Sequence, residues 1–215
     1  MKTKIILIRH GESLGNARRM LLGHTDMDLT ELGYRQAEAT AEALKDERID
    51  VIYSSDLLRA MNTAVPNATL RGIEVIPDRE LREIYLGDWE GRSVEDVMEQ
   101  YGRDTYLNDW VANYGTFVMP RGESTWECGE RFLLETRKIA EANEGKTVLI
   151  VAHGAVIRSF FANISGYTAE NMSNAVPFAA NASYSIAYYE NGVFTPSEYS
   201  VDGHLASVGI TKINW

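Results

Sequence analysis

The chain has 215 residues, of which 45% are apolar and 24% are charged, and this length favours one α/β domain over residues 1–215 with a modest insertion. The formal net charge of −10 at pH 7 argues against nucleic acid or an anionic membrane surface as a partner. A site for an anion must therefore be built locally, from arginines that are gathered against the overall charge.

The cysteine content and the N-terminal residues indicate a reducing compartment. Cys128 is the single cysteine, so no intramolecular disulfide can form, and Met1 leads into an apolar strand instead of a signal sequence. We therefore expect a cytoplasmic protein. The most apolar stretch, residues 148–161, is interrupted by His153 and Arg158 and is shorter than the about 20 residues of a membrane span.

Short β-rich runs alternate with longer helical patterns along the first third of the chain, which is typical of an α/β protein with a mostly parallel sheet. Residues 5–8 form the first predicted strand, and an amphipathic helix extends from its N-cap Thr30 to Lys45. The next predicted elements are a strand over 50–54, a helix that Ser55 or Asp56 caps and that continues through Ala64, and an edge strand over 72–77 that Pro77 closes.

The composition changes over residues 88–120, where strand signals are weak and acidic residues alternate with aromatic ones. We interpret this segment as a small helical insertion that lies over the sheet. The remaining predicted elements are a helix over 125–142, a strand over 147–152, a helix over 155–164, and a hairpin of strands 183–189 and 192–197 that turns at Asn191-Gly192.

Two of the 4 histidines follow predicted strands in the same way. His10 stands between Arg9 and Gly11 where the strand over 5–8 ends, and the pair His153-Gly154 follows the strand over 147–152. Ligands of open α/β sheets bind at the carboxyl ends of strands, where the loops converge. One such histidine alone is as readily a packed, hydrogen-bonded side chain, whereas two in matched settings favour a functional site.

Two further ionisable residues are expected at the same edge of the sheet. Arg59 lies near the start of a helix, where free backbone N–H groups already favour an anion, although it is equally typical of a surface arginine paired with Asp56. Glu83 follows the third predicted strand, although a solvated glutamate beside Arg82 has the same pattern.

Together these residues form a set that suits phosphoryl transfer without a metal. Two guanidinium groups can hold the phosphoryl oxygens, because their planar donors match oxyanion geometry. An unprotonated imidazole nitrogen can act as the nucleophile, and a carboxyl group can move the proton. The candidate catalytic residues are Arg9, His10, Arg59, Glu83 and His153.

Several motifs, taken in order over residues 3–160, resemble the histidine phosphatase superfamily, also called the phosphoglycerate mutase-like family. None is decisive alone, and the ordered set is specific. The motifs are Arg9-His10-Gly11-Glu12-Ser13 with Asn16, Leu29-Thr30 with Gly33 and Gln36-Ala37, Ser54-Ser55 with Arg59-Ala60 and Thr63-Ala64, Leu81-Arg82-Glu83 with Gly87-Asp88-Trp89-Glu90-Gly91, Gly122-Glu123-Ser124, and Val151-Ala152-His153-Gly154.

The resemblance implies a three-layer α/β/α fold of the phosphoglycerate mutase-like type, with a mostly parallel sheet and an antiparallel edge strand. It implies that His10 takes up the phosphoryl group and that Glu83 first protonates the leaving oxygen and then activates water. We expect burial under the insertion to poise that carboxyl group. The implied pocket around the phosphoryl group consists of Arg9, Asn16, Arg59, His153 and Gly154.

The resemblance leaves the choice between phosphatase and mutase open. Mutases resemble one another in a Glu-Arg-x-Tyr-Gly segment, whereas this chain has Glu83-Ile84-Tyr85-Leu86-Gly87, and Arg103 is the only basic residue between 93 and 120. An aromatic insertion poor in cations suits an apolar, neutral or cationic leaving group better than a small polyanion, although the aromatics also suit a core of the insertion itself. We therefore favour hydrolysis of a small-molecule phosphate monoester, without metal or cofactor, over 2,3-bisphosphoglycerate-dependent mutase activity.

Two readings from other classes stay open. Gly11-Glu12-Ser13-Leu14-Gly15 also fits the nucleophile elbow of serine α/β-hydrolases, with Asp202 and His204 downstream, although only one strand precedes Ser13. A non-catalytic phosphate-binding module is the second alternative. The substrate and the oligomeric state stay open, with a homodimer as one option, and so do the roles of Glu12, Arg18, Arg19, His24, Arg121 and His204.

Overall fold

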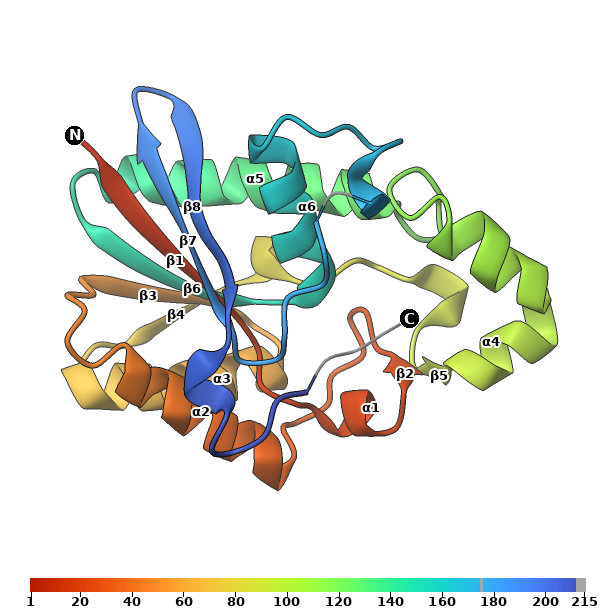
Figure 1. Cartoon of the computed structure of the whole chain (residues 1–215), viewed down its shortest axis with the longest axis horizontal. Coiled ribbons are helices and arrows are strands. Elements are labelled where there is room, and N and C mark those ends of the chain that lie inside the picture. The colour runs from red at the N-terminus through yellow and green to blue at the C-terminus, as the bar shows by residue number, and fades with distance from the viewer. Residues whose placement is uncertain (175, 212–215) are drawn as a thin grey trace.

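A central sheet of six strands organises the computed structural model, which describes residues 1–174 and 176–211. The sheet has the order β4-β3-β6-β1-β7-β8, in which β4, β3, β6 and β1 are parallel and β7 pairs antiparallel with both β1 and β8 (Figure 1). The strands are β1 (Thr3–Arg9), β3 (Val51–Ser55), β4 (Val75–Asp78), β6 (Thr147–Ala152), β7 (Tyr184–Glu190) and β8 (Val193–Val201).

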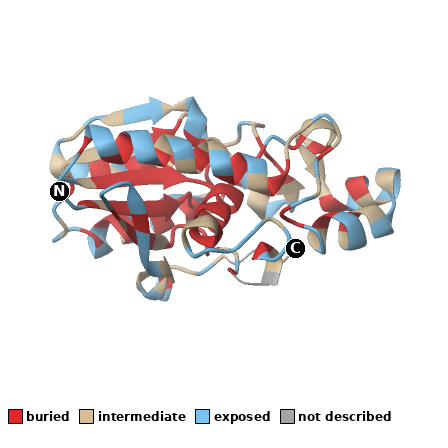
Figure 2. Ribbon diagram, turned by 90° about the horizontal axis from the view of Figure 1, so that it is seen from above, coloured by how far each residue is buried: buried red, intermediate tan, exposed pale blue. Residues whose placement is uncertain are grey.

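Helices cover both faces of this sheet, and the alternation of side chains in β1 shows how. Ile6 and Ile8 pack in the cluster that includes Ala60 of α3, whereas Ile5 and Leu7 pack in the cluster that includes Phe132 of α5. Buried residues therefore concentrate in the sheet and on the inward faces of the helices (Figure 2). The covering helices are α2 (Glu31–Ala43), α3 (Leu58–Arg71), α5 (Thr125–Ala142) and α6 (Gly154–Ile164). The predicted three-layer fold with a mostly parallel sheet is confirmed.

Most of the predicted elements lie where the pattern placed them. Thr30 caps α2, and its side chain accepts a hydrogen bond from Gly33 N. The strand that Pro77 closes, β4, lies at an edge of the sheet, and the hairpin turns at Asn191 and Gly192 with φ angles of +52° and +83°. Both angles belong to the left-handed region that a tight hairpin turn requires.

The predicted cap of α3 is wrong. Leu57 occupies the N-cap position without a side-chain hydrogen bond, because the two polar candidates have other partners. Ser55 contacts His153, and the Asp56 carboxylate pairs with Arg82 at 2.6 Å. The alternative in which Arg59 is a surface residue paired with Asp56 is therefore wrong.

The segment 88–120 contains helices, as predicted, but it lies at the end of the molecule opposite Met1 and not over a face of the sheet (Figure 1). It contains α4 (Val94–Tyr101) and the π-helix η3 (Thr105–Val111). The ring of Trp89 lies 5.6 Å from that of Trp110, between centroids, so the insertion has an aromatic core of its own. The remaining short elements are α1 (Leu14–Ala17), the paired strands β2 (Met20–Leu21) and β5 (Arg92–Ser93), and the 3-10 helices η1 (Arg79–Leu81), η2 (Gly87–Trp89), η4 (Met172–Asn174) and η5 (Gly203–Leu205).

Candidate active site

The two histidines that follow strands lie side by side. Strands β1 and β6 are adjacent and parallel, and Arg9 is in register with Ala152, so the next residues, His10 and His153, leave the sheet together. Their ring centroids are 5.2 Å apart, and the rings are inclined at 63°. The expectation that both side chains meet at the carboxyl edge of the sheet is met.

The environment of His10 fixes its tautomer. Its Nδ1 lies 2.7 Å from the carbonyl oxygen of Gly11, which can only accept, so Nδ1 carries the proton and Nε2 does not. The side chain is buried, and burial, followed by the charges of Arg59 and Arg9, holds the pKa of His10 well below its usual range. His10 is therefore a neutral imidazole with an unprotonated nitrogen.

His153 is buried beside it and does not line the cavity described below. Its Nε2 lies 2.8 Å from the hydroxyl oxygen of Ser55, a residue that sequence reasoning missed as a contact. Its Nδ1 has no hydrogen-bond partner among residues 1–174 and 176–211. Burial, together with the charge of Arg59, holds the pKa of His153 well below its usual range.

Two buried guanidinium groups flank the histidines. Arg59 is 1% exposed and donates to Gly23 O at 2.7 Å and to Thr25 O at 2.9 Å, and Arg9 donates to Ala179 O at 2.5 Å. Burial lowers the pKa of Arg59 to about 10, so this group still carries its charge at neutral pH. The Nε atoms of both arginines have no partner in the described part of the chain, which leaves donors for an anion.

The loop that holds Arg59 depends on Glu90. The Glu90 carboxylate accepts hydrogen bonds from His24 N at 2.9 Å, Thr25 N at 2.8 Å and Leu86 N at 2.9 Å, and from the Thr25 hydroxyl at 3.1 Å. These bonds fix the turn whose carbonyl groups bind Arg59. Glu90 belongs to one of the motifs that carry the family resemblance, but its role becomes evident only from the fold.

Asn16 is oriented by two donors. Its Oδ1 accepts from Ser13 N at 3.2 Å and from Asn181 Nδ2 at 3.0 Å, so its amide NH₂ group is available to a ligand in the cavity. Asn181 also donates to His10 O at 3.0 Å and thereby ties the turn after β1 to the segment before β7. The sequence contains no pattern that identifies Asn181 as a residue of the site.

Glu83 lines the cavity beside the start of α6. The side chain is partly buried, and its carboxylate accepts from Ile84 N at 3.0 Å, Ala155 N at 3.1 Å and Val156 N at 3.3 Å. The hydrogen bonds of the carboxylate therefore come from its neighbour Ile84 and from α6 and not from the insertion.

These side chains share one cavity, which is lined by polar and apolar residues. A Cβ atom at Gly154 would lie 3.2 Å from the guanidinium carbon of Arg9, so a glycine there leaves room for this side chain. Apart from Arg9 and Arg59, no lysine or arginine lines the cavity within the described ranges. The polar lining is Arg9, His10, Asn16, Arg59 and Glu83, and the apolar lining is Met20, Leu21, Leu22, Ile84, Leu86, Trp110, Tyr114, Ala155 and Phe178, with Gly23 and Gly154 between them.

The nucleophile-elbow reading of Ser13 is wrong. Ser13 is fully buried, and its hydroxyl oxygen caps α1 by accepting from Asn16 N at 3.2 Å. His204, the base that this reading required, lies 3.1 Å from the Thr40 hydroxyl and is elsewhere in the fold. Ser13 therefore lacks both the exposure and the base that a serine nucleophile needs.

The other residues without an assigned role divide between the site and the surface. His24 Nε2 donates to the backbone oxygen of Glu83 at 2.8 Å, so this histidine belongs to the site's surroundings. The Glu12 carboxylate accepts from Thr30 at 2.8 Å. The exposed Arg121 and Arg19 pair with Asp88 and Glu95.

Comparisons with known proteins agree with this geometry. The model of the histidine phosphatase superfamily (branch 1) matches residues 5–202. The chain is 37% identical to phosphoserine phosphatase 1 of Hydrogenobacter thermophilus, with 87% of each sequence covered. It is 32% identical to a metal-independent phosphoserine phosphatase of Arabidopsis thaliana, covering 98% of this chain and 86% of that one. It is also 32% identical to a probable phosphoglycerate mutase of Yersinia pestis, covering 77% and 76%.

Solved structures show the same fold. Bacillus stearothermophilus YhfR superposes with a TM-score of 0.87 at 30% identity, covering 94% of this chain and 99% of that one. A mycobacterial glucosyl-3-phosphoglycerate phosphatase, solved with VO3, gives a TM-score of 0.83 at 28% identity, covering 92% and 98%. None of the helices in the described ranges has the length and apolar character needed to cross a membrane.

Proposed function

Because the chain belongs to the histidine phosphatase superfamily, we propose that it hydrolyses small phosphate monoesters through a phosphohistidine on His10, without a metal. The observation that carries this proposal is the tautomer of His10. Its Nδ1 proton is committed to Gly11 O, and the unprotonated Nε2 belongs to a ring that lines a cavity between two arginines.

In the first step, His10 Nε2 attacks phosphorus, an N–P bond forms, and the bond from phosphorus to the ester oxygen breaks. Arg9, Arg59 and Asn16 hold the three peripheral oxygens, whose charge the guanidinium groups stabilise in the transition state. Glu83, in its protonated form, gives its proton to the leaving oxygen. The products of this step are a free alcohol, phosphohistidine and the Glu83 carboxylate.

In the second step, a water molecule attacks the phosphohistidine. The Glu83 carboxylate takes a proton from this water, the N–P bond breaks, and inorganic phosphate leaves with His10 restored. His153 packs against the His10 ring, and we assign it the role of holding that ring in place. The cycle ends with every group in its initial protonation state.

The leaving group of the substrate is proposed to be neutral and largely apolar. The rest of the lining includes an apolar wall of aliphatic and aromatic side chains such as Leu22, Ile84, Trp110 and Phe178. A carboxylate or a second phosphate on this wall would lose its hydration without gaining a cation. The net charge of −10 is a further reason to propose no nucleic acid or membrane as partner, and we propose a cytoplasmic location.

Mutase activity is the second candidate, favoured by the name of the Yersinia relative. One assay distinguishes the two. Wild-type protein and His10→Ala are incubated with p-nitrophenyl phosphate and EDTA, and separately with 3-phosphoglycerate with and without 2,3-bisphosphoglycerate. His204→Ala is the matched control, because it removes a histidine that lies elsewhere in the fold.

Phosphate release that EDTA does not affect, that His10→Ala abolishes and that the control retains is the expected result. Isomerisation of 3-phosphoglycerate only when the bisphosphate is present would replace the hydrolase with a mutase. An inactive wild type in every assay would favour the non-catalytic phosphate-binding module.

A further inference from the structure

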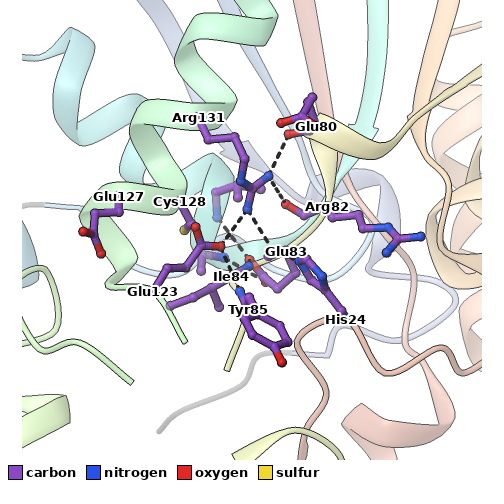
Figure 3. Close-up of polar contacts among 12 residues, drawn as sticks. His24, Glu80, Arg82, Glu83, Ile84, Tyr85, Glu123, Glu127, Cys128 and Arg131 are labelled. Carbon is purple, nitrogen blue, oxygen red and sulfur yellow. Dashed lines mark hydrogen bonds and ion pairs between the residues drawn. The ribbon is translucent and has the colours of Figure 1, made fainter. Parts of the chain in front are cut away.

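A partly buried arginine outside the cavity binds the backbone that leads to Glu83. Arg131 lies on α5, and its guanidinium donates to Glu80 O at 2.7 Å, Arg82 O at 3.0 Å and Glu83 O at 3.1 Å (Figure 3). These acceptors are backbone oxygens of one short segment that runs from η1 to Glu83 at the cavity. A single side chain therefore fixes the path of the backbone up to the residue that carries the acid.

A carboxylate completes this arrangement and extends it beyond Glu83. Glu123 pairs with Arg131 at 2.8 Å and also accepts a hydrogen bond from Tyr85 N at 2.9 Å (Figure 3). The backbone N–H of Glu123 donates to Tyr85 O at 3.0 Å. The segment is thus held before Glu83 by Arg131 and after it by Glu123.

The ion pair of Arg131 and Glu123 is partly shielded from solvent. The side chains of Arg131 and Glu123 are each 23% exposed. Only the planar fork of an arginine can bind three carbonyl oxygens and a carboxylate at once, whereas an ammonium group has three donors at one point. Removing the guanidinium would leave these acceptors partly buried and without this donor.

We propose that Arg131 is a positioning residue for the proton transfer by Glu83. The proposal rests on the proposed function, because it assumes that Glu83 protonates the leaving oxygen. Arg131 does not line the cavity, and among the described residues its one hydrogen bond to a lining residue goes to the Glu83 backbone. A shift of that backbone would move the carboxyl group away from the leaving oxygen while leaving His10 and its arginines in place.

The leaving group reveals such a shift. The oxygen of an alkyl phosphate must be protonated as its bond to phosphorus breaks, whereas p-nitrophenolate leaves readily as an anion. A misplaced acid therefore slows the cleavage of the alkyl ester and has little effect on the cleavage of the nitrophenyl ester. The value of kcat/KM isolates this effect, because it reports the steps up to release of the alcohol and excludes hydrolysis of phosphohistidine.

The test compares kcat/KM for n-butyl phosphate and p-nitrophenyl phosphate in wild type, Arg131→Met and Arg131→Lys. We expect Arg131→Met to lower the value for the alkyl ester about 10- to 100-fold and that for the nitrophenyl ester by less than about threefold. Arg131→Lys should retain part of the kcat/KM for the alkyl ester that Arg131→Met loses. The matched control is Arg137→Met, an exposed arginine of the same helix, which should change neither value.

A double mutant distinguishes positioning of Glu83 from a general structural role of Arg131. In a Glu83→Gln background no proton can be given, so Arg131→Met should no longer change the ratio of the two kcat/KM values. If Arg131→Met does not fold, Glu123→Gln carries the same comparison, with a smaller split in the same direction.

Equal losses for both substrates, or no loss for either, would overturn the positioning role. So would a change of the ratio that persists in the Glu83→Gln background. Failure of the proposed function is distinguishable, because it would appear as wild-type protein without phosphatase activity or as activity that survives in His10→Ala.

Discussion

The imidazole ring of His10 meets that of His153 edge to face, with centroids 5.2 Å apart. The two rings come from the adjacent parallel strands β1 and β6 and lie in a region that also holds the charges of Arg9 and Arg59. Burial and these charges lower the pKa of both histidines well below the usual value of 6.5. Both rings are therefore neutral in the folded protein, which permits their close approach and leaves one nitrogen free to attack.

Neutral buried histidines predict a loss of stability in acid. Between the ordinary pKa of 6.5 and the lower value in the folded protein, the unfolded chain binds a proton that the native chain does not. The free energy of unfolding should therefore fall by about 1 kcal/mol per histidine from about pH 6.5 to about pH 5.5, and show no such slope above that range. Urea unfolding of wild type and His10→Gln measures the difference. An identical acid slope in both proteins would contradict the neutral His10.

Ser55 is predicted to matter through its contact with His153. Ser55→Ala leaves the buried Nε2 of His153 without that partner, which should cost about 1 to 3 kcal/mol of stability and lower kcat/KM about tenfold. Ser54→Ala is the control, because this neighbouring hydroxyl donates to a backbone oxygen at 2.9 Å and not to the histidine. The contact has no catalytic consequence if the two variants have the same kcat/KM for p-nitrophenyl phosphate.

Glu90 is predicted to support phosphate binding from outside the cavity. In Glu90→Gln an NH₂ group replaces one of two oxygens that each accept two hydrogen bonds, so a donor faces donors in the turn that holds Arg59. We expect the KM for p-nitrophenyl phosphate to rise about tenfold and the free energy of unfolding to fall by about 2 kcal/mol. The exposed Glu99→Gln on α4 serves as the control. An unchanged KM in Glu90→Gln would show that Glu90 does not support phosphate binding.

The apolar wall predicts a preference among substrates. Phe178→Ala removes part of this wall and should lower kcat/KM for 1-naphthyl phosphate about fivefold relative to n-butyl phosphate, which corresponds to about 1 kcal/mol of lost apolar contact. Tyr167→Ala, which truncates a 39% exposed aromatic residue that does not line this cavity, is the control. A loss that is equal for both substrates would show that Phe178 does not select the leaving group.

Periodicity was sufficient for the six strands of the central sheet but not for the short strands β2 and β5, and motif position together with the family resemblance predicted the polar lining of the cavity. A predicted strand is followed by His-Gly at two places in the sequence. Because the residues that follow parallel strands meet at one edge of the sheet, this repetition indicated that the two histidines lie together. Helix starts were less predictable. Ser55 is a good N-cap residue in isolation, but its hydroxyl is engaged by His153, a contact between residues 98 positions apart.

The residues that hold the site in place could not be predicted, because their partners are backbone groups. Glu90, Asn181 and Arg131 bind the N–H or C=O groups of distant turns, and neither spacing nor residue type encodes which turn a side chain will reach. The aromatic residues of the insertion could be read as core or as substrate wall. Trp110 is both, since it packs on Trp89 and lines the cavity.

The phosphohistidine itself provides the most direct test. Wild-type protein is mixed with p-nitrophenyl phosphate, quenched within a turnover under conditions that preserve acid-labile phosphate, and mapped by peptide mass spectrometry. We predict one phosphoryl group on His10, lost on acid treatment and absent from His10→Ala. Continued turnover with no phosphorylated His10 at any quench time, or with the phosphoryl group on another residue, would contradict the account.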